Sequence, residues 1–386
     1  MENSGIAQKI PGNRVLSAVV PTRLCGAIKS LPEKIAGVLL PCCLLIAASP
    51  ALAAHTLSAA AELHTIPTGS RTIRIDSRLT IHDAYLNRPL KLRVYYPTRA
   101  GHWPVIIFSH GLGGNNQAFA KLNRVLAENG FVIIAPNHPD SGIFGRMRRN
   151  NQLHGRLVLH QSLITSGLTA TRRELHGKSP VMARLRQMEE ILDQLHAISH
   201  KLPGFNGRFD YHRIGMAGHS FGAVTSELMG GILRPTLLPV PWLPDRRIRA
   251  VEIISGRGSG PYTVVNSKAR RAGDIPLLVI TGSADNPPDG HGFAWREEPF
   301  LKSPPGNKFL LFIQGATHDS FGGDPLVCRM DSHAPNSERI QQIGEAVQRT
   351  SLEFWQYVFR RSDTAKTFLY SNVPGKSHDG INIQHK

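Results

Sequence analysis

Two kinds of hydrophobic pattern follow one another along the chain from Arg71 onward. At Arg71–Asp76 and Leu90–Tyr96 apolar and polar residues alternate, which predicts antiparallel edge strands with one wet face. Continuous apolar runs come next and predict parallel strands that are buried on both faces. These runs are Val105–Phe108, Phe131–Ala135, Ile214–Ala217, Ala250–Ile254, Leu277–Thr281 and Phe309–Ile313.

Helical spacing appears between these runs. Residues from about Asn116 to Glu128 place Phe119, Leu122 and Leu126 on one stripe, which predicts an amphipathic helix. A long last helix is predicted from about Ser337 to Phe359. Strands that alternate with helices predict an α/β protein with a doubly wound, mostly parallel sheet.

One segment interrupts the alternation, a helical insertion over about residues 144–205. It contains one persuasive helix, Ser179–Ser199, with apolar residues at helical spacing. Between Phe144 and His200 there are nine Lys or Arg residues against four Asp or Glu residues. Two interpretations remain open. The insertion is either a cap that meets an anionic surface, or a crossover helix with a solvated basic loop.

Residues 1–53 have the pattern of a signal peptide. Basic residues precede the apolar stretch Ile35–Ala48, and Ala51-Leu52-Ala53 offers a small-residue cleavage site. An uncleaved membrane anchor is the alternative, but the apolar stretch is shorter than a spanning helix and prolines flank or interrupt it. We therefore expect export to the periplasm or the medium after cleavage near Ala53, and one α/β domain over residues 54–386.

Cysteine content and charge narrow the possible kinds of site and binding partner further. Three of the four cysteines lie in the leader, so Cys328 alone remains, which excludes an intrachain disulfide and a cysteine-based metal site. The net charge of +17 indicates attraction to anionic surfaces such as a phospholipid membrane. Zinc-finger spacings and RNA-binding strand motifs are missing, so no nucleic-acid partner is expected. The sequence does not indicate the oligomeric state of the protein.

The stretch Arg213–Gly231 contains Gly218-His219-Ser220-Phe221-Gly222 between a predicted strand and a predicted helix. A sharp strand-to-helix turn strains the serine and brings neighbouring backbone close, so glycine is needed two residues before and two residues after it. This geometry exposes the serine hydroxyl above the end of the sheet. We therefore predict that Ser220 is a nucleophile.

A serine hydroxyl needs a histidine base, and the histidine needs a carboxylate to orient it. After a nucleophile elbow the acid and then the histidine follow on loops after later strands. Asp285 comes directly after the run that ends at Thr281, and His318 follows the run that ends at Ile313. The alternatives for the acid are Asp289 in the same loop, then Asp319, and last Glu252, which falls inside a strand.

The negative oxygen of a tetrahedral intermediate needs hydrogen-bond donors. The backbone N–H of Phe221 is one candidate, and that of Leu112, in the glycine-rich stretch Ser109–Gly114, is the other. Gly111 and His138 are candidates for the substrate pocket. Neither phosphate-loop spacing nor a zinc-protease motif occurs, so no cofactor and no metal are expected.

The stretches FSHGLGGNN, GFVIIAPNHP and RIGMAGHSFGA, with the late Asp and His, resemble the α/β-hydrolases grouped as platelet-activating-factor acetylhydrolase-like and predicted dienelactone hydrolases. The resemblance covers roughly Leu90 to Phe359. Animal acetylhydrolases carry the acid where this chain has Ser255-Gly256, and Asp285 instead matches the dienelactone-hydrolase and bacterial polyesterase-like arrangement.

The resemblance implies an α/β-hydrolase fold and a serine carboxylic-ester hydrolase. Its substrates would be short-chain or lipid-derived esters, and no cofactor would be needed. It implies Ser220, Asp285 and His318 as the triad, with Leu112 and Phe221 as the oxyanion donors. Two alternatives remain: a serine peptidase or amidase on the same fold, and an inactive hydrolase fold that binds anionic lipid or glycan.

Overall fold

The computed structural model describes residues 72–150, 160–236, 244–261, 263–267, 274–287, 290–371 and 379–386. The chain divides into two units, Met1–Ala48 and Ser49–Lys386, and every described residue belongs to the second. The predicted signal peptide lies outside the described residues. Within them, no helix is both long enough and apolar enough to cross a membrane.

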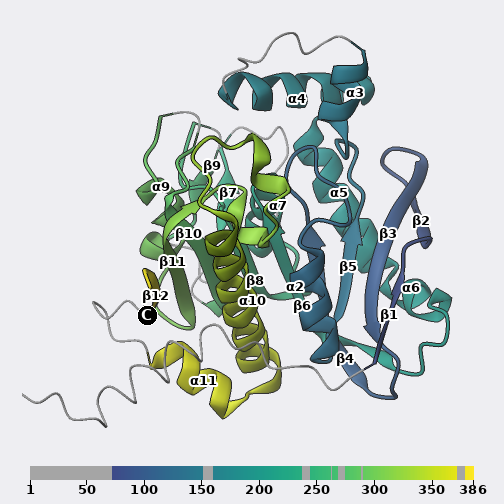
Figure 1. Ribbon diagram of the computed structural model, residues 1–386. Helices are drawn as coiled ribbons and strands as arrows, with labels where there is room; N and C mark the ends of the chain where they lie inside the picture. The colour runs from purple at the N-terminus through teal and green to yellow at the C-terminus, as the bar shows by residue number, and fades with distance from the viewer. Residues whose placement is uncertain are drawn as a thin grey trace, which may run out of the picture. The chain divides into compact units, whose positions relative to one another are not determined.

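A mixed sheet organises the described part of the chain (Figure 1). Its strands run in the order β1-β3-β5-β4-β6-β8-β10-β11-β12, with β2 beside β3. The strands are β1 (Ile73–Asp76), β2 (Thr80–Asp83), β3 (Arg88–Pro97), β4 (His102–Ser109), β5 (Val132–Pro136), β6 (Arg208–His219), β8 (Ile248–Ile254), β10 (Leu277–Ala284), β11 (Lys308–Thr317) and β12 (Ile381–His385). Strands β5, β4, β6, β8, β10 and β11 pair in parallel, while β1, β2, β3 and β12 join antiparallel. This arrangement confirms the predicted α/β-hydrolase fold with a mostly parallel sheet. The edge strand predicted over Leu90–Tyr96 is wrong as an edge, because this segment is β3, which lies between β1 and β5.

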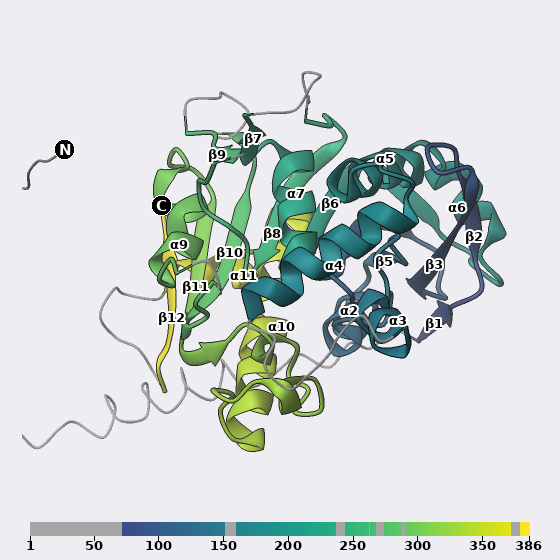
Figure 2. The same cartoon turned by 90° about the horizontal axis from the view of Figure 1, so that it is seen from above.

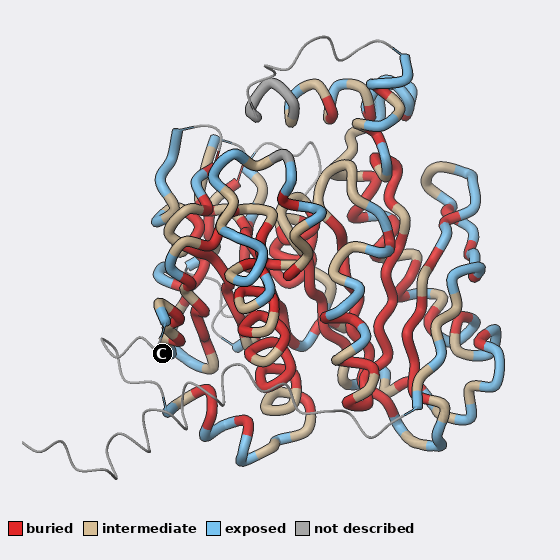
Figure 3. The backbone as a smooth tube through the Cα atoms, in the orientation of Figure 1, coloured by how far each residue is buried: buried red, intermediate tan, exposed pale blue. Residues whose placement is uncertain are grey.

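Helices cover both faces of the sheet, as the two views show (Figures 1 and 2). One face carries α2 (Ala120–Glu128), α10 (Ser337–Arg360) and α11 (Asp363–Tyr370), and the other carries α5 (Pro180–Asp193), α6 (Leu195–Lys201), α7 (Phe221–Gly230) and α9 (Ala294–Lys302). In β4, Val105 and Ile107 join the core under α5–α7, whereas Ile106 and Phe108 join the core under α2 and α10. The buried strands explain the continuous apolar runs of the sequence (Figure 3).

Several predicted boundaries are wrong. Helix α2 begins at Ala120 rather than near Asn116, because Phe119 has a left-handed backbone (φ 55°) that ends the preceding turn. The single helix predicted over Ser179–Ser199 is two helices, α5 and α6, which are separated at Gln194. Helix α10 is not the last element, since α11 and the edge strand β12 follow it.

Smaller elements complete the described part. A two-stranded sheet pairs β7 (Leu233–Pro235) with β9 (Thr263–Val265), and two 3₁₀ helices, η1 (Ser320–Gly322) and η2 (Val327–Met330), follow β11. Cys328 in η2 is a buried free cysteine.

The insertion divides into two parts. Helices α5 and α6 pack beside the sheet, against α7, β2 and β6, as crossover helices do. Helices α3 (Ile143–Arg149) and α4 (His160–Glu174) instead extend beyond the sheet, at the top of Figure 1. A Cβ atom added at Gly167 of α4 would lie 2.7 Å from the Phe144 ring and 3.3 Å from the Leu112 side chain. The insertion therefore reaches the loop after β4.

Candidate active site

Ser220 occupies the turn between β6 and α7 with φ 56° and ψ −116°, a conformation that strains any residue with a side chain. Glycine is required two residues before and two residues after Ser220, because neighbouring backbone atoms lie too close for a side chain. A Cβ atom at Gly222 would lie 1.9 Å from the Ser109 carbonyl oxygen, and one at Gly218 would lie 2.4 Å from the Gly222 carbonyl oxygen. The G-x-S-x-G spacing therefore allows β4, β6 and α7 to meet at this point.

The structure brings the three predicted residues Ser220, His318 and Asp285 together. His318 Nε2 lies 2.9 Å from Ser220 Oγ, and His318 Nδ1 lies 3.1 Å from Asp285 Oδ1. Ser220, Asp285 and His318 follow β6, β10 and β11 respectively, which are parallel, so all three arrive at the same edge of the sheet. Asp285 is fully buried, and the His318 side chain is 19% exposed.

The Asp285 carboxylate is stabilised in its charged form. Burial alone would raise the pKa of this carboxyl, but the Arg296 guanidinium, His318 and the Ser255 hydroxyl outweigh burial and hold the pKa below its usual value. Arg296 Nε lies 2.9 Å from Asp285 Oδ1, and Thr281 Oγ1 donates to Asp285 Oδ2 at 3.0 Å. Asp285 can therefore accept a hydrogen bond from His318 as an anion.

Ser255 and Arg296 are site residues that the sequence reasoning missed. Ser255 Oγ donates to Asp285 Oδ1 at 2.8 Å and lies 2.7 Å from His318 Nδ1. The Arg296 guanidinium donates to the backbone carbonyls of Asp285, Ser255 and Gly256. A signal existed for Ser255, because it directly follows a predicted buried strand. No spacing in the sequence indicated Arg296.

The rival acids occupy different surroundings. Glu252 is buried inside β8, where it accepts hydrogen bonds from Ser351 (2.5 Å) and Trp355 (2.6 Å) of α10. Asp319 follows His318 in the chain and precedes η1. Asp289 lies outside the described residues.

The glycine-rich loop after β4 lies against the elbow. A Cβ atom at Gly111 would be 3.4 Å from Ser220 Cβ, an ordinary contact, and 3.1 Å from His219 Nδ1, a tight one, so the loop packs directly against the elbow. Leu112 is the next residue. Phe221 begins α7, so its N–H belongs to the first turn, which has no partner within the helix. The backbone of both predicted donors thus lies next to Ser220.

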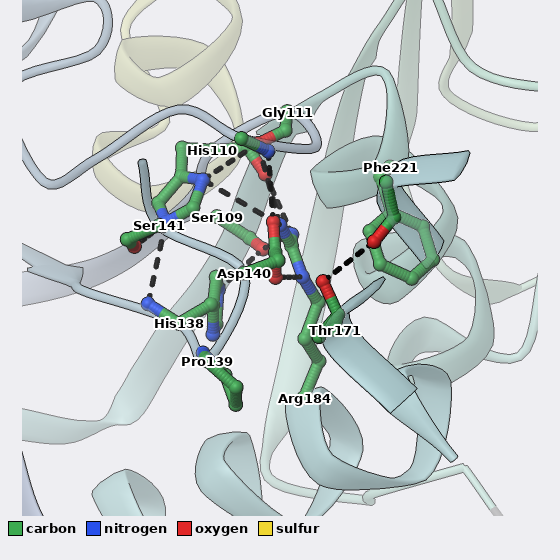
Figure 4. A network of polar contacts seen from close by, with 12 residues as sticks. Ser109, His110, Gly111, His138, Pro139, Asp140, Ser141, Thr171, Arg184 and Phe221 are labelled. Carbon is green, nitrogen blue, oxygen red and sulfur yellow. Dashed lines mark hydrogen bonds and ion pairs between the residues drawn. The ribbon is translucent and has the colours of Figure 1, made fainter. Parts of the chain in front are cut away.

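The pocket prediction for His138 is corrected. His138 is buried, and its ring nitrogens lie 2.9 Å from Ser109 Oγ and 2.9 Å from Gln187 Oε1 (Figure 4). Burial and the nearby Arg184 charge lower the pKa of this imidazole well below its ordinary value. A side chain that is enclosed and bonded in this way belongs to the protein interior rather than to a pocket wall.

His219, inside the elbow motif itself, was also missed. Its Nε2–H donates to the His318 carbonyl at 2.9 Å, and its ring packs against that of His318 with the centroids 4.8 Å apart. Burial and the neighbouring His318 lower the pKa of His219 to about 3, so the ring is neutral. Within the described ranges, no group of three His, Cys, Asp or Glu side chains could hold a metal ion.

The fold described above is that of the α/β-hydrolases. Residues 82–229, from within β2 to the last turn of α7, match the family model described as "Platelet-activating factor acetylhydrolase, isoform II". The "Platelet-activating factor acetylhydrolase" of Canis lupus familiaris is 26% identical over 143 residues, which cover 33% of this chain and 32% of that protein. A "Putative phospholipase A2" of Schizosaccharomyces pombe is 27% identical over 168 residues, which cover 36% of this chain and 38% of that protein.

The chain is thus similar, over less than half of its length, to platelet-activating-factor acetylhydrolases, as its sequence motifs indicated. It covers less than two fifths of the length of these two relatives. The family match includes Leu112, Ser220 and Phe221, and it ends before Asp285 and His318. The second half of the site therefore depends on geometry alone.

Proposed function

We propose that the protein is a serine carboxylic-ester hydrolase with Ser220, His318 and Asp285 as its catalytic triad. The observation that carries the proposal is the continuous hydrogen-bonded path from Ser220 Oγ through the His318 ring to the buried Asp285 carboxylate. The strained backbone of Ser220 supports it, because strain of this kind is maintained only where the surrounding structure enforces it.

In the proposed reaction His318 Nε2 removes the proton from Ser220 as the serine oxygen attacks the ester carbonyl. The oxyanion that forms accepts hydrogen bonds from the N–H groups of Leu112 and Phe221. His318 then returns the proton to the leaving alcohol, and an acyl-enzyme remains on Ser220. Water that is activated by His318 releases the acid. Asp285 holds the Nδ1–H tautomer of His318 throughout.

The substrate class follows from the relatives and from charge. One relative is named for an acetylhydrolase and the other for a phospholipase, which supports short-chain or lipid-derived esters. Arg148 and Arg149 at the end of α3 and Arg172 and Arg173 at the end of α4 are exposed. We propose that this part of the insertion is a cap that meets an anionic membrane surface, and that the protein acts after export.

A kinetic panel tests the proposal. We expect the wild-type protein to hydrolyse p-nitrophenyl esters of rising chain length, and Ser220→Ala to lose activity by about 10⁴-fold or more. Ser199→Ala on α6 is the matched control and should retain wild-type rates. Faster cleavage of peptide p-nitroanilides than of esters would favour the peptidase alternative. Wild-type protein without any ester turnover, but with affinity for lipid or glycan, would favour the binding-module alternative.

A further inference from the structure

Arg184 of α5 is a fully buried cation in the insertion, and its guanidinium faces the loop after β4 (Figure 4). It forms a two-pronged ion pair with Asp140, with Nε 3.0 Å from Oδ1 and a terminal nitrogen 2.7 Å from Oδ2. The remaining N–H groups donate to the carbonyls of His110 (2.6 Å) and Gly111 (3.3 Å). One side chain therefore connects the loop after β5 to the loop after β4.

Asp140 holds the other side of the same loop. Its Oδ2 accepts the backbone N–H of Gly113 at 2.9 Å. Leu112 consequently lies between two residues that the ion pair holds, with the Gly111 carbonyl bonded to Arg184 and the Gly113 N–H bonded to Asp140. The orientation of both peptide planes that flank Leu112 is set in this way.

Arg184 also contacts the second oxyanion donor. Its guanidinium carbon lies 4.3 Å from the centroid of the Phe221 ring, a cation–π contact with the first residue of α7. One guanidinium thus contacts both the residue before Leu112 and the ring of Phe221, although Leu112 and Phe221 follow different strands.

A series of hydrogen bonds that begins at Ser109 also restrains Arg184. Its NH1 lies 3.3 Å from Ser109 Oγ, which is bonded to His138, and His138 Nδ1–H donates to Gln187 Oε1. The Gln187 amide donates in turn to Asp83 of β2 at 2.6 Å. Gln187 lies one turn after Arg184 on α5, so the helix supplies both side chains. Every side chain in this series of hydrogen bonds has a partner, which limits the conformational freedom of the Arg184 guanidinium.

We propose that Arg184 and Asp140 are a positioning pair that sets the geometry of the oxyanion hole, and that α5 is in the insertion to deliver Arg184 to it. This inference rests on the proposed ester-hydrolase function. A buried ion pair is a weak source of stability, because desolvation of the two charges offsets their attraction. Its orientation toward both oxyanion donors gives it a role that a packed apolar pair could not perform.

The test uses Arg184→Lys, which keeps the charge and loses the planar fork, with Arg186→Gln on the same helix as control. Arg186 pairs with Glu189 on the surface. Rates are counted per active site by titration with a fluorophosphonate, so that misfolded protein does not contribute. We expect kcat per titrated site to fall about 10²-fold, the order of the loss when an oxyanion donor is removed, with KM within about twofold. Inhibition by a trifluoromethyl ketone, which presents an oxyanion, should weaken by the same factor as kcat/KM.

The variant Asp140→Asn tests the same idea if Arg184→Lys does not fold, since asparagine keeps an acceptor for Gly113. We expect a loss of about tenfold in kcat and a matching loss in ketone affinity. A purely structural role would lower the melting temperature and the titrated fraction but leave kcat per site unchanged, and that outcome would overturn the proposal.

Amide exchange separates this inference from the proposed function, because it needs no turnover. In Arg184→Lys the peptide over residues 109–116 should exchange faster, whereas strand β10 should not change. Unaltered exchange at 109–116 would contradict the positioning role even if the wild-type protein proved inactive on every ester. Wild-type inactivity with faster exchange in the variant would instead refute only the ester-hydrolase function.

Discussion

Two oxygen atoms lie within hydrogen-bonding distance of His318 Nδ1, one on Asp285 and one on Ser255. Ser255 follows β8, and its hydroxyl donates to the carboxylate of Asp285, which follows the neighbouring strand β10. The predicted Ser220, Asp285 and His318 followed from a spacing motif and from strand ends. Ser255, Arg296 and Arg184 reach the site because the fold brings distant segments together, and no local pattern in the sequence encodes that.

For the acid we predict that Asp285→Asn lowers kcat by about 10⁴-fold, because an amide no longer holds the required imidazole tautomer. Asp289→Asn, four residues along the same loop, is the matched variant and should change kcat by less than about tenfold. Steady-state kinetics on one soluble ester measures both. Equal losses, or a larger loss at Asp289, would reassign the acid.

At the scale of elements, periodicity located the buried strands correctly and failed at ends and edges. The runs at Ile214–Ala217 and Phe309–Ile313 are the interiors of longer strands, whose ends continue into polar residues that pair with neighbours. Strand β12 was not predicted because its alternation of apolar and polar residues extends over only five residues. The break at Gln194 escaped prediction because the apolar spacing continues across it, through Leu192 and Leu195, both buried.

The elbow gives a prediction at this scale. In Gly222→Ala the new methyl group would meet the Ser109 carbonyl at 1.9 Å, so α7 and β4 must separate. We expect the free energy of unfolding to fall by about 3 kcal/mol and esterase activity to be lost. Gly145→Ala on α3 is the control, because its nearest neighbour would be a flexible arginine atom at 3.7 Å. Urea unfolding measures both variants, and equal stability would show that the close packing is not required.

At the scale of the whole molecule, the net charge of +17 is the feature that the fold leaves unexplained. The ion pairs of Arg184 with Asp140 and of Arg146 with Glu174 do not contribute to it, because each cation is balanced by an anion. Exposed arginines of the insertion that are outside these pairs lie at the ends of α3 and α4. The cap interpretation of the insertion can therefore be tested at these four arginine side chains.

We predict that replacing Arg148, Arg149, Arg172 and Arg173 by glutamine weakens binding to anionic vesicles and slows hydrolysis at their surface. Attraction of this kind is screened over about 8 Å at physiological salt, so the wild-type binding should also weaken as salt rises. Turnover of a short soluble ester should stay within about twofold, because the triad is untouched. Vesicle sedimentation measures the effect, and salt-independent or unchanged binding would leave these helices as a solubilising surface only.

Three buried histidines predict sensitivity to acid. Burial lowers the pKa of His110 to about 4 and that of His219 to about 3, and the pKa of His138 is also well below its ordinary value. Below about pH 6.5 the unfolded chain binds protons that the folded protein does not, so stability is full above that pH and is lost as pH falls toward about 4.

The expected slope is about 1.4 kcal/mol of unfolding free energy per pH unit for each of these histidines. Urea unfolding between pH 7.5 and pH 4.5 measures it, and His219→Gln should reduce the slope by one histidine's share. His196→Gln, on the exposed surface of α6, is the matched surface control. A free energy of unfolding that does not change from pH 7 to pH 5 would contradict this prediction, because it would mean that these rings bind protons as readily in the folded protein as in the unfolded chain.

The central claim is that Ser220 is a nucleophile activated by His318, and covalent labelling tests it most directly. A fluorophosphonate added to the purified protein should give one adduct per chain by intact mass, which peptide mapping places on Ser220. The adduct should be absent from Ser220→Ala and from denatured protein, and it should form far more slowly in His318→Gln. Labelling of another serine, or a Ser220→Ala variant that still hydrolyses esters, would contradict the account.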